Sequence, residues 1–433
     1  MKSLPTAVLS LLCLVAPLRA QPQGQAAPAA TITKYDRGAV LAMLKQVKAD
    51  LKEYYYDRAF RGMDVEQTFQ QAEERLRSAS SIGQAVGTIA DVLMRLDDSH
   101  TIFLPPDRKA RILYGWRCQM IGDAPIVTEV AAGSDAEKQG IDVGDRVLAW
   151  NEYAPSRESL GKINYVYYLV RPQPVQRLVL RKADGALKTL QVATSFEDRH
   201  EDDMPSVLAS IFNLYEHADD REETLGETFI WRYTGFGDPK DVERVIRKAR
   251  GSKSLVLDLR GNSGGTVNAL RAMVSWLFDR DVQIGVERMR KEEKPLTAKG
   301  RKDAFAGTLI VLVDSWSGSS SEMLARLVQI EKRGVVMGDR TAGAVMSARM
   351  FPHVYGDDRL TVYATMITVG DVRMADGSSL EKTGVTPDET VLPTPADVAA
   401  KHDPVLARAV AALGGTLTPE EAGRLFRQEK KQP

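Results

Sequence analysis

The chain has 433 residues, which is enough for two or three domains. Its apolar and charged fractions, 43% and 27%, are typical of an ordinary soluble globular protein. Basic and acidic residues are equal in number, 58 of each, so the formal net charge is zero. This balance gives no reason to expect a nucleic acid or an anionic membrane surface as a partner.

The N-terminus has the parts of a secretory signal peptide over residues 1–20. Lys2 supplies the positive charge, residues 7–15 are apolar, and Ala20 precedes the expected cleavage point. The apolar run is too short to span a bilayer, so we expect no membrane anchor. Cleavage would leave Cys118 as the one cysteine, which excludes an internal disulfide. We therefore expect an exported protein, periplasmic or secreted from a bacterium.

Changes in apolar spacing divide the rest of the chain into five parts. Residues 21–34 predict a flexible linker, and residues 35–108 predict a helical subdomain. Residues 109–200 are typical of short strands with turns. Residues 201–395 alternate strands with helices, which indicates an α/β layer structure. Residues 396–433 predict a packing helix and a charged tail.

Within residues 201–395, the apolar runs and the helical spacing predict particular elements. The expected strands are residues 228–233, 254–258, 308–313 and 334–337, and the expected helices are residues 205–215, 239–249, 266–278 and 323–330.

The segment from Ser315 to Glu322 carries the candidate reactive group. It lies between the strand 308–313 and the helix 323–330. Small residues at such a junction are where open α/β sheets expose a reactive group. A hydroxyl there also lies beside free backbone N–H groups, which can hold a developing oxyanion. Taken alone, the segment is explained more simply as a Ser-rich helix cap and turn.

A Gly-rich stretch, residues 258–265, follows another apolar strand. Its glycines allow N–H groups to converge on one point, as an oxyanion requires, although a plain strand-to-helix connection explains them equally well. The stretch is neither a Walker loop nor a dinucleotide fingerprint, and the five histidines form no metal-binding pattern. We therefore expect no cofactor.

Residues 126–151 resemble a PDZ domain, with a strand, a short helix carrying Ala136, and a Gly-containing turn into the next strand. The turn glycines permit the tight bends that this pattern needs. Residues 115–117 stand where PDZ domains carry their carboxylate-binding loop but lack its usual motif. The resemblance thus leaves open whether this part binds peptide termini or only positions other parts.

Four motifs together resemble the C-terminal processing peptidase and tricorn protease family: residues 258–265, 317–322, 338–343 and 384–388. The resemblance covers residues 85–395 and implies a ClpP/crotonase-like catalytic core beside a PDZ domain. The family's nucleophile is the serine three positions before the acid that opens the helix, which is Ser319 here. The backbone N–H groups of Gly265 and Ser320 match the family's oxyanion hole.

The catalytic base distinguishes two branches of this family. Processing peptidases use a Ser–Lys dyad, but this chain has Ala344 at the lysine position and Ala348 at that of a glutamine. Tricorn-like members use a histidine from a Ser-His pair ahead of the PDZ domain. Ser99 and His100 match that pair.

A glutamate completes the tricorn-like set, and Glu381, just before the motif 384–388, matches it. The resemblance implies that His100 acts as general base and acid, with Ser99 and Glu381 orienting the imidazole. Among the other histidines, His353 is the main rival because it lies near the catalytic core in sequence.

The sequence therefore predicts an exported serine peptidase that acts on peptide or unfolded-protein substrates. The alternative is a non-catalytic protein that binds a peptide or an apolar ligand on the same scaffold. It is supported by the alanines at positions 344 and 348. The substrate, the cleavage preference and the choice between a monomer and a homo-oligomer stay open.

Overall fold

The computed structural model describes residues 32–108, 110–198, 220–356 and 361–426, all within one unit, Thr31–Pro433. The expected signal peptide, most of the expected linker, the helix expected at residues 205–215 and the end of the tail lie outside these residues. Of the described helices, none is long and apolar enough to cross a membrane.

The N-terminal part is helical, as the sequence predicts, and has three α-helices. They are α1 (Lys34–Tyr54), α2 (Val65–Arg77) and α3 (Ile82–Met94), with a short 3-10 turn η1 (Phe60–Gly62). Each α-helix begins after a side chain that accepts a backbone N–H bond: Thr33, Asp64 and Ser81. Their apolar faces pack together and against Tyr363 and Ile367.

A small β domain follows. Its main sheet has the strand order β3-β4-β5-β6-β7, and β2 pairs separately with β8. Its core gathers Trp116, Trp150 and Tyr167. The elements are β2 (Ala110–Leu113), β3 (Trp116–Ile121), β4 (Ala124–Val130), α4 (Asp135–Lys138), β5 (Arg146–Trp150), α5 (Leu160–Asn164), the π-helix η2 (Tyr165–Val170), β6 (Val175–Arg181), β7 (Leu187–Ala193) and β8 (Ser195–Asp198).

The largest sheet has the order β18-β15-β14-β11-β10-β9, and all its neighbours are parallel except β9 and β10. The predicted strands of this region and the helices predicted at residues 239–249, 266–278 and 323–330 are confirmed to within a residue or a few residues at each end. The elements are β9 (Arg221–Leu225), β10 (Thr228–Arg232), α7 (Pro239–Ala249), β11 (Ser254–Asp258), α8 (Val267–Leu277), β14 (Thr308–Val313), α9 (Ser320–Ile330), β15 (Val335–Gly338) and β18 (Glu389–Thr390).

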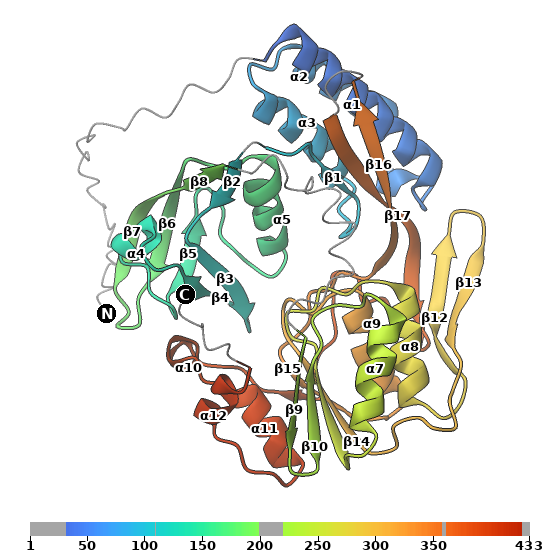
Figure 1. Ribbon diagram of the computed structural model, residues 1–433. Coiled ribbons are helices and arrows are strands. Elements are labelled where there is room, and N and C mark those ends of the chain that lie inside the picture. Colours follow the sequence, from blue (N-terminus) through green and yellow to red (C-terminus); the bar gives the residue numbers. More distant parts are fainter. Residues whose placement is uncertain (1–31, 109, 199–219, 357–360, 427–433) are drawn as a thin grey trace, which may run out of the picture. The chain divides into compact units, whose positions relative to one another are not determined.

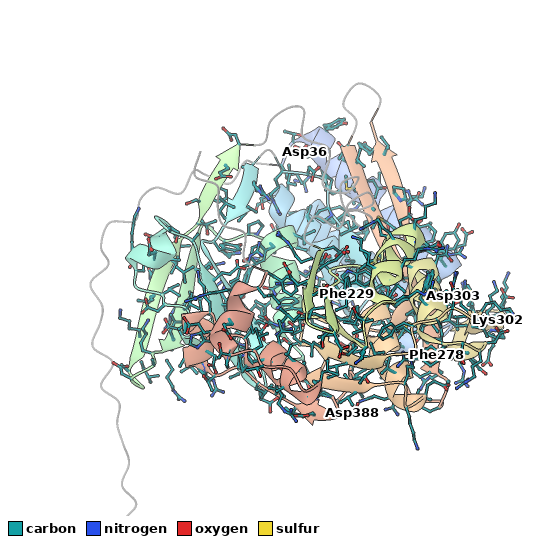
Figure 2. The ribbon with its side chains drawn as sticks, turned by 60° about the horizontal axis from the view of Figure 1, so that its bottom comes forward. Asp36, Phe229, Phe278, Lys302, Asp303 and Asp388 are labelled. Carbon is teal, nitrogen blue, oxygen red and sulfur yellow. The ribbon has the colours of Figure 1, made fainter. Side chains whose placement is uncertain are left out.

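Alternate residues of these strands face two different layers. Leu255 and Leu257 pack with α7, α8 and α9 on one face, while Val256 packs with α11 on the other (Figure 1). Phe229 and Phe278, labelled in Figure 2, belong to the first of these cores. The C-terminal helices are α10 (Pro395–Ala400), α11 (Pro404–Ala412) and α12 (Pro419–Arg424).

A second sheet has the order β1-β17-β12-β13, with β16 paired to β17. Its strands are β1 (Ile102–Leu104), β12 (Val282–Met289), β13 (Glu293–Ala298), β16 (Met346–Tyr355) and β17 (Thr361–Met374). One end of β17 pairs with β12, and its other part pairs with β1. Because β1 begins two residues after His100, its pairing with β17 holds the histidine's segment to the rest of the chain.

Candidate active site

Ser319 occupies a strained turn between strand β14 and helix α9. Its backbone has φ 52° and ψ −117°, which is uncommon for a residue with a side chain. Its N–H group is fixed from two sides, by the Ala344 carbonyl oxygen at 2.9 Å and by Glu322 Oε2 at 3.0 Å. The turn is thus held in one conformation by groups on both sides of it.

Ser319 differs from its neighbouring serines in what its hydroxyl does. The other four serines of residues 315–321 each donate a hydrogen bond to a backbone carbonyl oxygen: Ser315 to Met120 (2.6 Å), Ser317 to Leu259 (2.8 Å), Ser320 to Gly265 (3.2 Å) and Ser321 to Asn262 (2.8 Å). Within the described chain, the Ser319 hydroxyl makes no such bond. It is also half-exposed, whereas Ser317, Ser320 and Ser321 are buried. Ser319 is therefore the serine of this segment whose hydroxyl proton is not held by a backbone carbonyl oxygen.

The Gly-rich loop after β11 lies directly against this turn. A Cβ atom on Gly264, which has φ +102°, would come within 2.6 Å of the Ser319 Cβ and 3.0 Å of the Ser320 nitrogen. The buried Asn262 joins the two loops, because its carbonyl oxygen accepts the Gly318 N–H (3.0 Å) as well as the Ser321 hydroxyl. Only glycine fits this approach.

Two backbone N–H groups remain available beside Ser319. Ser320 is the first residue of α9, where an N–H group has no intrahelical partner. Over the described ranges, neither its N–H nor that of Gly265 donates a hydrogen bond to the protein. The Ser320 hydroxyl bonds the Gly265 carbonyl oxygen at 3.2 Å, so the two residues are neighbours. Two such donors can stabilise a developing oxyanion.

Glu322 is fully buried and holds the surrounding loops. Its carboxylate accepts four hydrogen bonds: from Thr341 Oγ1 (2.6 Å) and from the N–H groups of Gly343 (2.7 Å), Ala344 (2.9 Å) and Ser319 (3.0 Å). Burial raises its pKa to about 7, and the four donors oppose that rise because each favours the ionised form. The sequence predicts only a helix N-terminal acid here. The structure adds a buried anchor for the loop after β15.

His100, Ser99 and Glu381 form a hydrogen-bonded relay. The Ser99 hydroxyl lies 2.6 Å from His100 Nδ1 and 2.8 Å from Glu381 Oε2, and Glu381 Oε1 accepts the Ser99 N–H at 2.9 Å. An ionised carboxylate can only accept, so the hydroxyl proton goes to Glu381 and Nδ1 of His100 carries a proton. Nε2 then presents a lone pair.

The pKa of each titratable group in the relay is shifted by burial. Burial lowers the pKa of His100, and the nearby Asp98 charge partly opposes this. Burial also raises the pKa of Glu381, against the hydrogen bonds from Ser99 and from the Val345 N–H. A neutral imidazole is the form that can accept a proton.

One loop joins the relay to the serine turn. Glu381 Oε2 accepts the Val345 N–H at 3.0 Å, and the preceding residue, Ala344, contacts both Ser319 and Glu322. Among the described residues, no hydrogen bond connects the His100 ring directly to Ser319. The loop at Ala344 and Val345 thus links the relay of Ser99, His100 and Glu381 to the turn that carries Ser319, with Ser320 and Gly265 beside it. The hydrogen bond between the His100 imidazole and the Ser319 hydroxyl is not formed.

Asp98 is the residue that the sequence analysis did not single out. Its Oδ1 accepts from the N–H groups of His100 (3.0 Å) and Thr101 (2.7 Å) and from Thr368 Oγ1 (2.8 Å). Its Oδ2 accepts from the Tyr55 hydroxyl (2.8 Å) and Thr101 Oγ1 (3.0 Å). An Asp two residues before a candidate His is typical of an Asx turn, and this pattern could have identified it.

The two other described histidines, His353 and His402, have partners outside the relay. His353 lies in β16, where its Nε2 pairs with the buried Asp50 at 2.7 Å. His402 lies 3.8 Å from Asp397, and His200 and His217 fall outside the described residues. In the described part of the chain, no three His, Cys, Asp or Glu side chains gather as they would around a metal ion.

Comparison with known proteins relates the chain to a group of peptidases. Residues 229–391 match peptidase family S41. A chloroplastic C-terminal processing peptidase of Tetradesmus obliquus is 26% identical over 367 residues, which cover 78% of this chain and 75% of that protein. A tail-specific protease of Haemophilus influenzae is 29% identical over 161 residues, covering 35% of this chain and 22% of that protein.

A solved structure agrees at the level of the fold. The crystal structure of mature CPAF superposes with a TM-score of 0.62 at 15% identity, covering 84% of this chain and 95% of the other. The likeness supports the mixed α/β fold of this class of protease. The chain is similar to the C-terminal processing and tail-specific proteases, its residues 229–391 match peptidase family S41, and it is a serine-type peptidase.

Proposed function

We propose that the chain is an exported peptidase that hydrolyses peptide bonds through an acyl-enzyme on Ser319, with His100 as general base and acid. The observation that carries this proposal is the relay from His100 through Ser99 to Glu381. Glu381, at the end of this relay, accepts the Val345 N–H, and the adjacent Ala344 carbonyl oxygen accepts the Ser319 N–H. Catalytic hydrogen bonds often form only once substrate is bound, so the open contact between His100 and Ser319 is compatible with this role.

In the proposed reaction, Ser319 Oγ attacks the scissile carbonyl carbon while His100 Nε2 removes the hydroxyl proton. The N–H groups of Gly265 and Ser320 donate to the oxyanion of the tetrahedral adduct. The adduct collapses, the C–N bond breaks, and the imidazolium gives its proton to the leaving amine. Water then attacks the acyl-enzyme with His100 again as base, which releases the carboxylate product and restores Ser319.

Ser99 and Glu381 act on the imidazole. The Glu381 carboxylate holds the Ser99 proton, so the hydroxyl oxygen faces Nδ1–H and fixes the productive tautomer. When His100 becomes charged, the same carboxylate stabilises the imidazolium through the intervening hydroxyl. This is the role of the aspartate in a Ser-His-Asp triad with one hydroxyl interposed.

The proposal also covers the architecture. The motif order supports a PDZ-like identity for residues 109–200 and a ClpP/crotonase-like identity for residues 201–395. Peptide would lie between the helical and β parts and the catalytic core. His100 and Ser319 come from different parts, so closure on a peptide would complete the site. Finding the two side chains fixed and adjacent in both free and inhibitor-bound forms would refute this gating.

A second candidate is a peptide-binding protein without catalysis. It is supported by Ala344, where processing peptidases carry their lysine. Nor does Lys382 replace that lysine, because its ammonium group pairs with Asp97. Under this alternative, the same cleft would hold a peptide and leave it intact.

Hydrolysis of an unfolded protein separates the two candidates. The mature chain, residues 21–433, and its Ser319→Ala variant would be incubated with reduced, alkylated casein, with new amino termini counted over time. The proposal expects cleavage by the wild type and none by the variant. Binding of casein by both proteins with no cleavage by either would favour the second candidate.

A further inference from the structure

A cleft of about 850 Å³ lies away from the proposed catalytic residues, none of which lines it. One wall comes from α2 and α3, and the other comes from the β2–β8 ribbon and the end of η2. Its volume falls within the roughly 300–1,000 Å³ that small-ligand and peptide sites occupy. The cleft is therefore large enough for more than an inorganic ion.

Its charge is positive and only partly compensated. Arg75 pairs with Asp91 at 3.0 Å, which leaves Arg108 and Arg171 as the other charged lining residues. In the part of the chain that the structure describes, neither of these two guanidinium groups pairs with a carboxylate. A chain of zero net charge thus keeps two unpaired arginines in one cleft.

Arg108 is held in place without neutralisation. It donates to the carbonyl oxygens of Leu169 and Val170, each at 2.8 Å, at the C-terminal end of η2. A guanidinium has five N–H donors, so these two bonds leave others for a ligand. Burial lowers the pKa of Arg108, opposed only by the Tyr114 hydroxyl, yet an arginine stays charged at neutral pH.

Arg171 lies against α3 at Gly87. A Cβ atom at Gly87 would come within 2.8 Å of Arg171 Cδ, so the missing side chain makes room for the arginine. Two aromatic rings complete the lining: Tyr153 is 42% exposed and Phe196 is 55% exposed. Exposed rings beside unpaired guanidiniums complement a ligand that carries both carboxylates and an apolar side chain.

We propose that this cleft binds an acidic peptide segment, with Arg108 and Arg171 on its carboxylates and Tyr153 and Phe196 against its apolar side chain. The proposal concerns binding only and does not depend on the chemistry at Ser319. For a peptidase, such a site would hold a substrate chain at a distance from the scissile bond.

Fluorescence anisotropy tests the proposal on the mature chain carrying Ser319→Ala, which prevents cleavage. One probe is the fluorescein-labelled amidated peptide Gly-Glu-Leu-Glu-Phe-Gly, and the other has both glutamates replaced by glutamine. We expect the acidic peptide to bind at least about tenfold more tightly, since charge-assisted hydrogen bonds exceed neutral ones by that order. Raising the salt concentration should weaken the binding of the acidic peptide and leave that of the glutamine peptide unchanged.

Arg171→Gln is the decisive variant, because its guanidinium makes no bond within the described residues and its loss leaves η2 intact. We expect this variant to lower the affinity for the acidic peptide about tenfold and to leave the affinity for the glutamine peptide unchanged. Arg111→Gln is the matched control, since Arg111 lies exposed on the same strand as the cleft residue Ile112 but does not line the cleft. It should change neither affinity.

Three results would overturn the proposal: equal affinity for the two peptides, equal effects of Arg171→Gln and Arg111→Gln, or no binding of the acidic peptide up to about 1 mM. Absence of binding is also the result expected if another part of the chain, or a second copy of it, fills the cleft.

Discussion

Replacing Glu381 by glutamine perturbs the relay at a single proton. The glutamate only accepts, which makes Ser99 Oγ a donor to Glu381 and an acceptor from His100 Nδ1. A glutamine amide turned toward Ser99 donates instead. The Ser99 hydroxyl would then give its proton to Nδ1, and the imidazole would carry its own proton on Nε2, where it cannot serve as a base.

The size of the effect follows from two contributions. Loss of a hydrogen bond to a charged group costs about 1.5–3 kcal/mol, or roughly ten- to 150-fold in rate. A wrong imidazole tautomer in a Ser-His-Asp triad costs up to about 10⁴-fold in kcat. Because Ser99 is interposed and can rotate, we expect Glu381→Gln to lose between about 10² and 10⁴ in kcat/KM, with little change in KM.

The assay is steady-state hydrolysis of a quenched fluorescent peptide by the wild type, Glu381→Gln, Ser99→Ala and the double variant. Residues that act as one unit are non-additive, so the double variant should be no slower than the slower single variant. Thermal unfolding of each variant controls for folding, since Glu381 also accepts the Val345 N–H. An activity of Glu381→Gln within threefold of the wild type, or single effects that multiply, would refute the relay.

Three further predictions concern the groups around the relay. Asp98→Asn should lower kcat/KM about ten- to 100-fold. It should also shift the fall in kcat/KM at acid pH, which for the wild type lies below about pH 6.5, to still lower pH, because the Asp98 charge raises the pKa of His100. The pH profile of kcat/KM measures both the drop and the shift. Gly264→Ala should abolish labelling of Ser319 by a fluorophosphonate probe, because the new Cβ atom would collide with the Ser319 turn. Gly261→Ala is the control: its φ is also positive but the space around its Cβ atom is open, so it should lose only about 1 kcal/mol of stability and keep its activity. Glu322→Gln should lower the free energy of unfolding by about 3 kcal/mol in a urea titration, since two of its four donors lose their acceptor, and an unchanged unfolding midpoint would contradict its role as an anchor.

The core and the serine turn could be predicted because they are encoded locally. Residues 255–257 and 309–313 are continuous apolar runs, as strands buried on both faces require, and the structure has strands at these residues. The small residues between the second strand and α9 mark the turn that carries Ser319. The N-terminal helical part likewise follows from helical spacing.

Strands β16 and β17 could not be read from the sequence in this way. Met346–Tyr355 contains Arg349 and Pro352 among its apolar residues, and its burial pattern shows no clear alternation. Besides pairing with the preceding strand β16, β17 is stabilised by pairing with β1 and β12, which lie far from it in sequence. Local patterns carry no information on such pairing.

Two site residues were hidden for the same reason. The role of Asp98 depends on Thr368, and these partners meet only in the folded chain. Glu322 has the sequence position of an exposed helix-start acid, but the loop through Thr341 and Gly343 folds over it and buries it. His353 was an alternative to His100 as the catalytic base only because sequence alone cannot show its pairing with Asp50.

The claim that His100 activates Ser319 is tested most directly by labelling the mature protein with a fluorophosphonate probe. Intact-mass spectrometry would follow the adduct on the wild type, Ser319→Ala and His100→Ala. We predict one adduct on the wild type, none on Ser319→Ala, and a labelling rate lowered by at least about 10²-fold in His100→Ala. Labelling of His100→Ala at the wild-type rate would contradict the account.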